Sequence, residues 1–217
     1  MTRVKICCIS SIEEAQLAIK YGASALGLVS AMPSGPGVIS EELIEQIAEK
    51  IPPGISTFLL TSKQSVEEII EQQRRCKTNT VQICDKIVQG NYIQLKKALP
   101  GIKIVQVIHI TGEEALDEAI GVSKNVDALL LDSGNQKLAV KELGGTGRTH
   151  DWSISRKIVD SVKIPVFLAG GLNAENVADA VRHVKPFGVD ICSGVRTNGK
   201  LDEKKMKSFF TNLNTVQ

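Results

Sequence analysis

The feature that most constrains the fold is an alternation of strand-length apolar runs with amphipathic stretches of helical period, repeated along the whole chain. Each apolar run ends in Gly, Pro, Ser, Asn or Asp, as parallel α/β units require. The predicted strands are Val4 to Cys7, Ala25 to Val29, Ser56 to Leu60, Thr80 to Ile83, Lys103 to Ile108, Ala128 to Leu131, Val166 to Leu168 and Val189 to Ile191. Helices are predicted over 11–21, 40–50, 65–75, 112–122, 153–162, 174–184 and 202–213.

This rhythm predicts the α/β class and one (β/α)8 TIM barrel over residues 1–217, a common length for that fold. No linker or shift in composition divides the chain. The alternative, an open doubly wound sheet, usually carries G-x-G-x-x-G after its first strand. Here the first predicted strand is followed by Cys8, Ile9 and Ser10, without a glycine. A closed barrel is therefore favoured.

Charge and cysteine usage limit the partners. The 26 basic residues nearly balance the 24 acidic ones, and a net charge of +2 argues against nucleic acid and membrane surfaces as partners. The five cysteines have no C-x-x-C spacing, so we expect no metal site, free thiols and a reducing cytoplasm. No leader is visible, and no apolar run approaches the ~20 residues that span a bilayer. We expect a cytoplasmic protein.

Glycines gather after the last three predicted strands, where barrels of this kind typically hold phosphate. Without a Cβ, glycine lets backbone N–H groups approach an anion closely. Any one pair has the alternative interpretation of a tight turn, but three such loops on adjacent strands predict a phosphate-bearing ligand. The candidate binding residues are Gly144, Gly145, Gly147, Gly170, Gly171, Ser193 and Gly194, together with Lys5 in the first strand.

Two side chains are candidates for proton transfer. Cys7 shares a strand face with Lys5, and both point into the barrel if Ile6 packs outward; a lysine near a thiol favours the thiolate. Asp132 ends an apolar run where a core position would ask for an aliphatic residue. The alternatives are a small buried hydrophobe at Cys7 and a solvated loop aspartate. A thiolate facing a carboxylate suits paired proton transfers that isomerise sugars without metal or cofactor.

The motifs VKIC, DALLLD, GGTGRTHDW, VFLAGGLNAENV and GVDICSGV resemble, in order and spacing, the phosphoribosylanthranilate isomerase family of tryptophan biosynthesis. The likeness covers nearly the whole chain. It implies an Amadori rearrangement of an aldose aminosugar phosphate to a 1-amino-ketose, with Cys7 as general base and Asp132 as general acid. It also implies that backbone groups around Gly145, Gly171, Ser193 and Gly194 hold the phosphate of a sugar-phosphate substrate.

The chain is a divergent member by this resemblance. Cys8 stands where the family usually has glycine, and MPSGPGVIS contains no basic residue where the family carries an arginine expected to bind the anthranilate carboxylate. Strand four ends QICD where a histidine is common, and the last motif continues to Arg196 where an acid is usual. Arg196, Arg148 and His109 are candidates to replace the missing cation, and each is also readable as a solvated surface charge.

Two alternatives to phosphoribosylanthranilate isomerisation stay open. The first is an isomerase of the same family acting on another phosphorylated sugar or aminosugar, and the second is a non-catalytic barrel that binds a phosphoribosyl metabolite. Retention of both Cys7 and Asp132 favours an enzyme. The outer helix faces show no distinct pairing pattern, so a monomer or a homodimer is expected.

Overall fold

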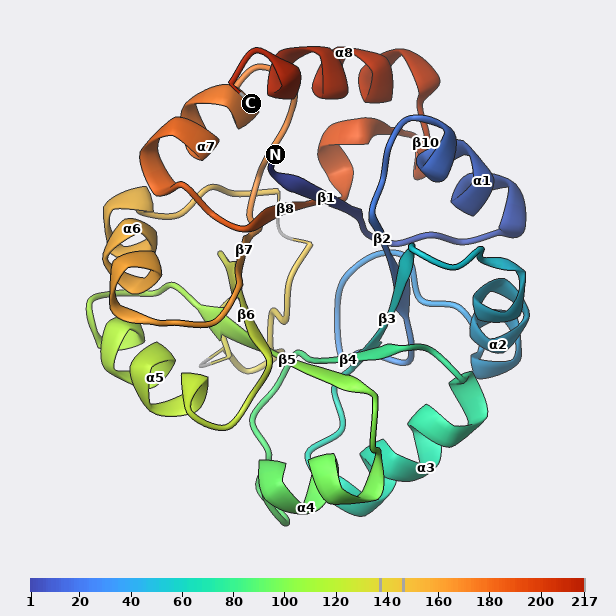
Figure 1. The fold of residues 1–217 in the computed structure, drawn as a ribbon, viewed down its shortest axis with the longest axis vertical. Helices are drawn as coiled ribbons and strands as arrows, with labels where there is room; N and C mark the ends of the chain where they lie inside the picture. The colour runs from blue at the N-terminus through green and yellow to red at the C-terminus, as the bar shows by residue number, and fades with distance from the viewer. Residues whose placement is uncertain (137, 146, 217) are drawn as a thin grey trace.

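The computed structural model describes residues 1–136, 138–145 and 147–216. Its strands form a closed parallel barrel in chain order, and the last strand pairs with the first (Figure 1). The strands are β1 (Arg3–Ile6), β2 (Ala25–Val29), β3 (Ser56–Thr61), β4 (Thr80–Ile83), β5 (Lys103–His109), β6 (Ala128–Asp132), β7 (Val166–Leu168) and β8 (Gly188–Ile191). The predicted single-domain (β/α)8 barrel is confirmed.

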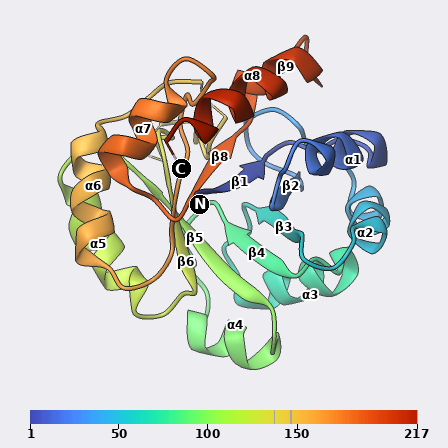
Figure 2. The ribbon, with the colours of Figure 1, turned by 45° about the horizontal axis from the view of Figure 1, so that its top comes forward.

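The helices form an outer ring, with α1 to α3 on one side of the barrel and α5 to α7 on the other (Figure 2). They are α1 (Ile12–Lys20), α2 (Glu41–Lys50), α3 (Val66–Cys76), α4 (Tyr92–Ala98), α5 (Glu114–Ser123), α6 (Trp152–Ser161), α7 (Val177–Val184) and α8 (Glu203–Asn214). Serine side chains cap the starts of two of them: the Ser11 hydroxyl accepts from the Glu14 N–H, and the Ser40 hydroxyl from the Leu43 N–H. None of the described helices is both long and apolar enough to cross a membrane.

The sequence did not reveal helix α4 or the small hairpin before α8. Helix α4 has seven residues and buries only Leu95, which is too little to display a helical period. A capping box formed by Asn91 and Gln94 starts it instead. The hairpin pairs β9 (Arg196–Thr197) with β10 (Lys200–Leu201) and follows the 3-10 turn η1 (Ser193–Val195).

Two apolar layers explain why the barrel is stable. Outward-facing strand residues such as Ile6 pack under the helices, whereas Phe58, Leu130 and Phe167 fill the interior of the barrel. Lys5 is fully buried in that interior, with its ammonium 5.4 Å from the centre of the Phe58 ring. The predicted alternation along the first strand, with Ile6 outward and its neighbours inward, is therefore confirmed.

Long loops after β2 and β6 cross the barrel axis at the carboxyl ends of the strands (Figure 1). They are tied together where the Ser34 hydroxyl donates to the Lys141 carbonyl oxygen at 2.5 Å. The Lys141 ammonium in turn pairs with Asp85, just after β4, at 2.5 Å. These two loops therefore cover the carboxyl ends of the strands.

Candidate active site

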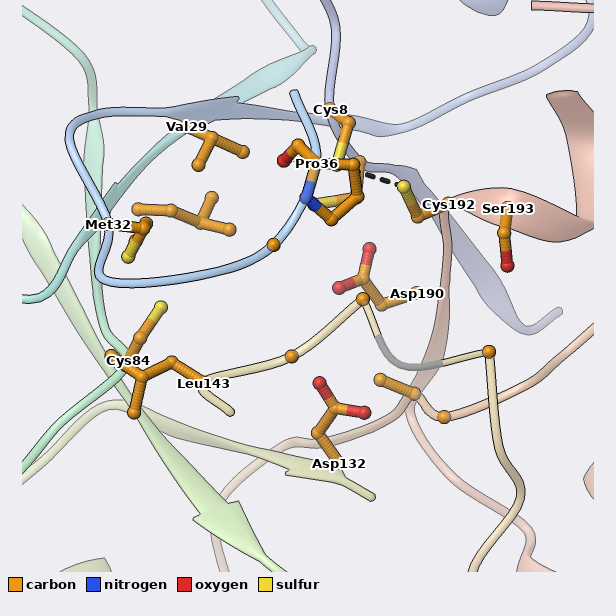
Figure 3. Close-up of a pocket in the computed structure, with 18 of the residues that line it drawn as sticks. Cys8, Val29, Met32, Pro36, Cys84, Asp132, Leu143, Asp190, Cys192 and Ser193 are labelled. Atoms are coloured by element: carbon orange, nitrogen blue, oxygen red, sulfur yellow. Dashed lines mark hydrogen bonds between the residues drawn. The ribbon is translucent and has the colours of Figure 1, made fainter. Parts of the chain in front are cut away.

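A cavity opens at the carboxyl ends of the strands, beneath the loops after β2 and β6 (Figure 3). Its volume, with the open solvent at the mouth included, is about 690 Å³. Eight of the predicted site residues line it: Cys7, Asp132, Gly144, Gly145, Gly147, Gly170, Gly171 and Ser193. The structure therefore brings the candidate base, the candidate acid and the glycine loops to one space.

Cys7 lies directly after β1, and Lys5 lies two residues before it on the same face of the strand. A β-carbon added to Gly27 would lie 2.9 Å from the Cys7 Sγ and 3.0 Å from the Lys5 Nζ, so thiol and ammonium lie side by side over that glycine. The Lys5 ammonium donates to Asp190 Oδ2 at 2.8 Å. Burial alone lowers the pKa of Lys5, but the Asp190 carboxylate and the Cys7 thiol outweigh it and the net pKa is raised.

Lys5 therefore remains charged in the barrel interior, below the cavity, and is not among the residues that line the cavity. The ammonium places a fixed positive charge beside the Cys7 sulfur. Its place suits action on Cys7 better than contact with a substrate phosphate.

Asp132 is the last residue of β6 and is only 7% exposed. Its Oδ1 accepts from the Ser133 N–H at 2.7 Å. Burial raises the pKa of Asp132, and the Asp190 carboxyl adds to this, against the Ser133 N–H and His109, which lower it. A carboxyl with a raised pKa keeps its proton to higher pH, which is what a general acid requires.

The loops after β6, β7 and β8 meet backbone to backbone. A β-carbon on Gly171, which has a φ of +62°, would lie 2.7 Å from the Arg148 carbonyl carbon, and one on Gly147 would lie 3.7 Å from the Ser193 hydroxyl. Gly194 does not itself line the cavity, but a β-carbon there would collide with the Leu172 carbonyl oxygen. Glycine is therefore required at positions 171 and 194 for these loops to converge, whereas the contact at Gly147 is an ordinary one.

The three candidate cations do not line the cavity. Arg196 is buried, and its terminal nitrogens contact Glu14 at 3.0 and 3.1 Å and the carbonyl oxygens of Cys7 and Cys8 at 3.1 and 2.6 Å. Because these contacts occupy the guanidinium and hold the end of β1, the prediction that Arg196 binds a substrate carboxylate does not fit its placement. Arg148 pairs with Glu142, and the His109 Nε2 lies 3.0 Å from the Cys84 carbonyl oxygen.

Sequence analysis missed Asp190, which lines the cavity from β8 and interrupts an apolar strand just as Asp132 does. The same signal was present there and could have found it. It also missed Cys192, half-buried beside the cavity, whose residue type and spacing gave no signal. Within the described residues, no group of three or more His, Cys, Asp or Glu side chains is arranged to hold a metal ion.

Cys8 keeps the left-handed backbone conformation that glycine adopts readily, with a φ of 60°. A non-glycine residue there costs on the order of 1–2 kcal/mol. Its side chain lies against the loop after β2, where Sγ is 3.5 Å from the Pro36 carbonyl oxygen. The cysteine therefore follows a glycine-like path and adds a thiol at the edge of the cavity.

A (β/α)8 barrel that gathers a thiol, a carboxyl of raised pKa and three converging glycine loops in one cavity fits the class of acid–base isomerases of phosphorylated sugars. Residues 4–212 match the family model described as N-(5'-phosphoribosyl)anthranilate (PRA) isomerase. The chain belongs to this family. It is therefore an enzyme, an intramolecular oxidoreductase that isomerises phosphoribosylanthranilate in tryptophan biosynthesis.

Similar proteins cover the whole barrel. N-(5'-phosphoribosyl)anthranilate isomerase 2 of Methanosarcina mazei is 39% identical over 209 residues, which span 95% of this chain and 92% of that protein. The crystal structure of phosphoribosyl anthranilate isomerase from Thermotoga maritima is 30% identical, with a TM-score of 0.82 and coverage of 99% and 100%. A phosphoribosyl anthranilate isomerase in complex with reduced 1-(o-carboxyphenylamino)-1-deoxyribulose 5-phosphate is 29% identical, with a TM-score of 0.79 and the same coverage.

Proposed function

We propose that the chain isomerises N-(5'-phosphoribosyl)anthranilate by acid–base catalysis, with Asp132 as general acid and Cys7 as general base. The observation that carries this proposal is that both side chains, from strands that are not neighbours in the barrel, face one largely buried cavity. The solved relative that holds a reduced carboxyphenylamino-deoxyribulose phosphate supports the substrate class.

In the proposed reaction, Asp132 gives its proton to the ribose ring oxygen, and the ring opens to a protonated Schiff base. The Cys7 sulfur then takes the proton from C2, and the electron pair of that C–H bond forms the enolamine. Tautomerisation of the enolamine gives the 1-amino-ketose. The raised pKa of Asp132 supports the first step, and the ammonium of Lys5 beside the sulfur supports the second.

We assign the phosphate of the substrate to the loops after β6, β7 and β8. Gly145, Gly147, Gly171 and Ser193 line the cavity there, and the three glycines have no side chain that would keep an anion away from their backbone N–H groups. Gly194 supports this site from behind by allowing the close approach to Leu172. A phosphate bound at this end orients the ribose toward Cys7 and Asp132.

We assign the aromatic ring of the substrate to the opposite, apolar side of the cavity. Val29 at the end of β2, Met32 of the loop after β2 and Leu143 of the loop after β6 line that side (Figure 3). Leu60 of β3 also lines the cavity. A flat apolar ring removes water from these side chains, which is favourable by about 25 cal/mol per Å² of apolar surface. A cytoplasmic location and a monomeric or homodimeric state stay predictions.

The test is turnover of phosphoribosylanthranilate, followed by the loss of anthranilate fluorescence, for wild type, Cys7→Ser and Asp132→Asn. We expect each variant to lose about 10²-fold or more in kcat, because each removes one proton-transfer group. Asp132→Asn is expected to unfold at the same or a higher temperature at neutral pH, because its raised pKa means that ionisation of Asp132 costs stability. Turnover by Asp132→Asn at the wild-type rate would show that the acid is another residue.

A further inference from the structure

Two cysteines from opposite ends of the chain meet at the mouth of the cavity. Cys8 follows β1 and Cys192 follows β8, and their Sγ atoms lie 2.9 Å apart (Figure 3). A disulfide bond is about 2.05 Å long, so the sulfurs need to approach each other by less than about 1 Å to form one. Both residues line the same cavity as Cys7 and Asp132.

The backbone around Cys8 holds its thiol against Cys192. The left-handed conformation of Cys8, with φ at 60°, directs its side chain toward the loop after β2. Gly37 of that loop packs so tightly that a β-carbon on it would lie 2.9 Å from the Cys8 Sγ. The sulfur is thereby confined between the Gly37 backbone, the Pro36 carbonyl oxygen and the Cys192 sulfur.

The two thiols differ in reactivity. The hydrogen bond with Cys8 lowers the pKa of Cys192, and the Arg196 guanidinium acts in the same direction. The same hydrogen bond and burial raise the pKa of Cys8. Cys192 is also the more exposed of the two, since Cys8 is only 5% exposed. A reagent arriving from solvent therefore meets Cys192 first, which is the more exposed and the more readily ionised of the two thiols, and Cys8 lies behind it.

We propose that Cys8 and Cys192 form a thiol–disulfide exchange site that closes to an intramolecular disulfide when it meets a small-molecule disulfide. The Cys192 thiolate attacks one sulfur of the reagent and displaces one small thiol. Cys8 then loses its proton to solvent, and its sulfur attacks the Cys192 Sγ and displaces the second. Two protein thiols are oxidised, one reagent disulfide is reduced to two thiols, and excess small thiol reverses both steps.

Closure of this disulfide alters the catalytic geometry, and this part of the inference rests on the proposed function. Cys8 directly follows the base Cys7, and Cys192 directly precedes Ser193 in the phosphate loop. Bringing the two sulfurs together shifts one or both of these neighbours relative to the bound sugar. Because a misplacement of about 1 Å can cost about 10²-fold in rate, the oxidised protein loses at least about tenfold in kcat/KM.

The experiment treats the reduced full chain with oxidised glutathione, then alkylates the remaining thiols and digests with trypsin. Two of the five thiols are expected to disappear, and peptide 6–20 is expected to be linked to peptide 183–196. Cys7 and Cys8 share a tryptic peptide, so tandem fragmentation places the bond. The drop in kcat/KM should accompany the link, and dithiothreitol should reverse both.

Cys192→Ser, compared with its own reduced sample, should show neither the link nor the loss of activity. The matched control is Cys76→Ala, a buried cysteine of α3 outside the cavity, which should keep both responses. A lasting glutathione adduct on Cys192, a link to Cys7, or a Cys8–Cys192 link with unchanged kcat/KM would each overturn the proposal. If reduced wild type fails to turn over phosphoribosylanthranilate, the proposed function falls, while the mapped link still decides the thiol pairing.

Discussion

Gly27 is the position where one added methyl group should displace the candidate base, although Gly27 itself does not line the cavity. It lies in β2 next to β1, and a β-carbon there would sit 2.9 Å from the Cys7 Sγ and 3.0 Å from the Lys5 Nζ. Ordinary van der Waals contacts begin at 3.4 Å. In Gly27→Ala the thiol, the ammonium or the strand must therefore move by roughly half an ångström or more.

The expected loss can be divided into stability and rate. Overpacking of this kind costs about 1–3 kcal/mol of folding free energy, which lowers the melting temperature by roughly 2–4 °C per kcal/mol in a chain of this size. The displaced thiol should lower kcat/KM by about 10- to 100-fold, because proton abstraction is sensitive to sub-ångström placement. The rate loss should therefore exceed what partial unfolding at 25 °C explains.

The assay combines thermal unfolding by circular dichroism with kcat/KM from anthranilate fluorescence. Gly121→Ala is the matched control, since a β-carbon at this glycine of α5 meets nothing within 4 Å; it should raise stability by about 0.5–1 kcal/mol and leave kcat/KM unchanged. A Gly27→Ala protein that is destabilised but fully active would show that the position of the Cys7 sulfur does not govern the rate, and the base assignment would fail.

Three further perturbations test other parts of the site. Arg196→Met should cost about 3–5 kcal/mol in urea unfolding, because the largely buried Glu14 carboxylate loses its partner; a large rise in KM with unchanged stability would instead make Arg196 a substrate ligand. His150→Gln should make the free energy of unfolding less dependent on pH under acid conditions. Burial lowers the pKa of His150 from 6.5 to about 4, so the wild-type protein loses free energy of unfolding as the pH falls from 6.5 toward 4. An unchanged slope between pH 7 and pH 4 would contradict this. Gly194→Ala should raise the KM for phosphoribosylanthranilate by roughly tenfold or more, as the phosphate loop is pushed off Leu172, and a wild-type KM would remove that loop from the site.

Local pattern was enough to predict most of the barrel and to select the two candidate proton-transfer side chains that line the cavity. Strand period and loop punctuation are properties of short segments, and parallel strands of a barrel all end on one face, so Cys7 and Asp132 had to meet if the fold was right. The short helix α4 escaped because one buried leucine shows no period. Asp190 escaped although it carries the same signal as Asp132, a carboxylate inside an apolar strand.

Contacts between distant segments could not be predicted in the same way. Arg196 and Glu14 are 182 residues apart, and Cys8 and Cys192 are 184 apart. Each pair depends on the register in which β8 joins β1, where Lys5 lies opposite Asp190. A one-residue slip would turn these side chains to other faces. For that reason Arg196 was readable as a free cation from the sequence, although the fold occupies it.

The seam between β1 and β8 also orders events during biosynthesis. The Lys5 ammonium, set in the barrel interior, has its counter-ion on β8, the last strand of the barrel. A nascent chain that has made only β1 to β7 carries the Lys5 charge without its partner beside Cys7, and closure of the barrel neutralises that charge. The proposed proton abstraction by Cys7 therefore requires β8 to be in place, and we expect chains that end before β8 to be inert as well as unstable.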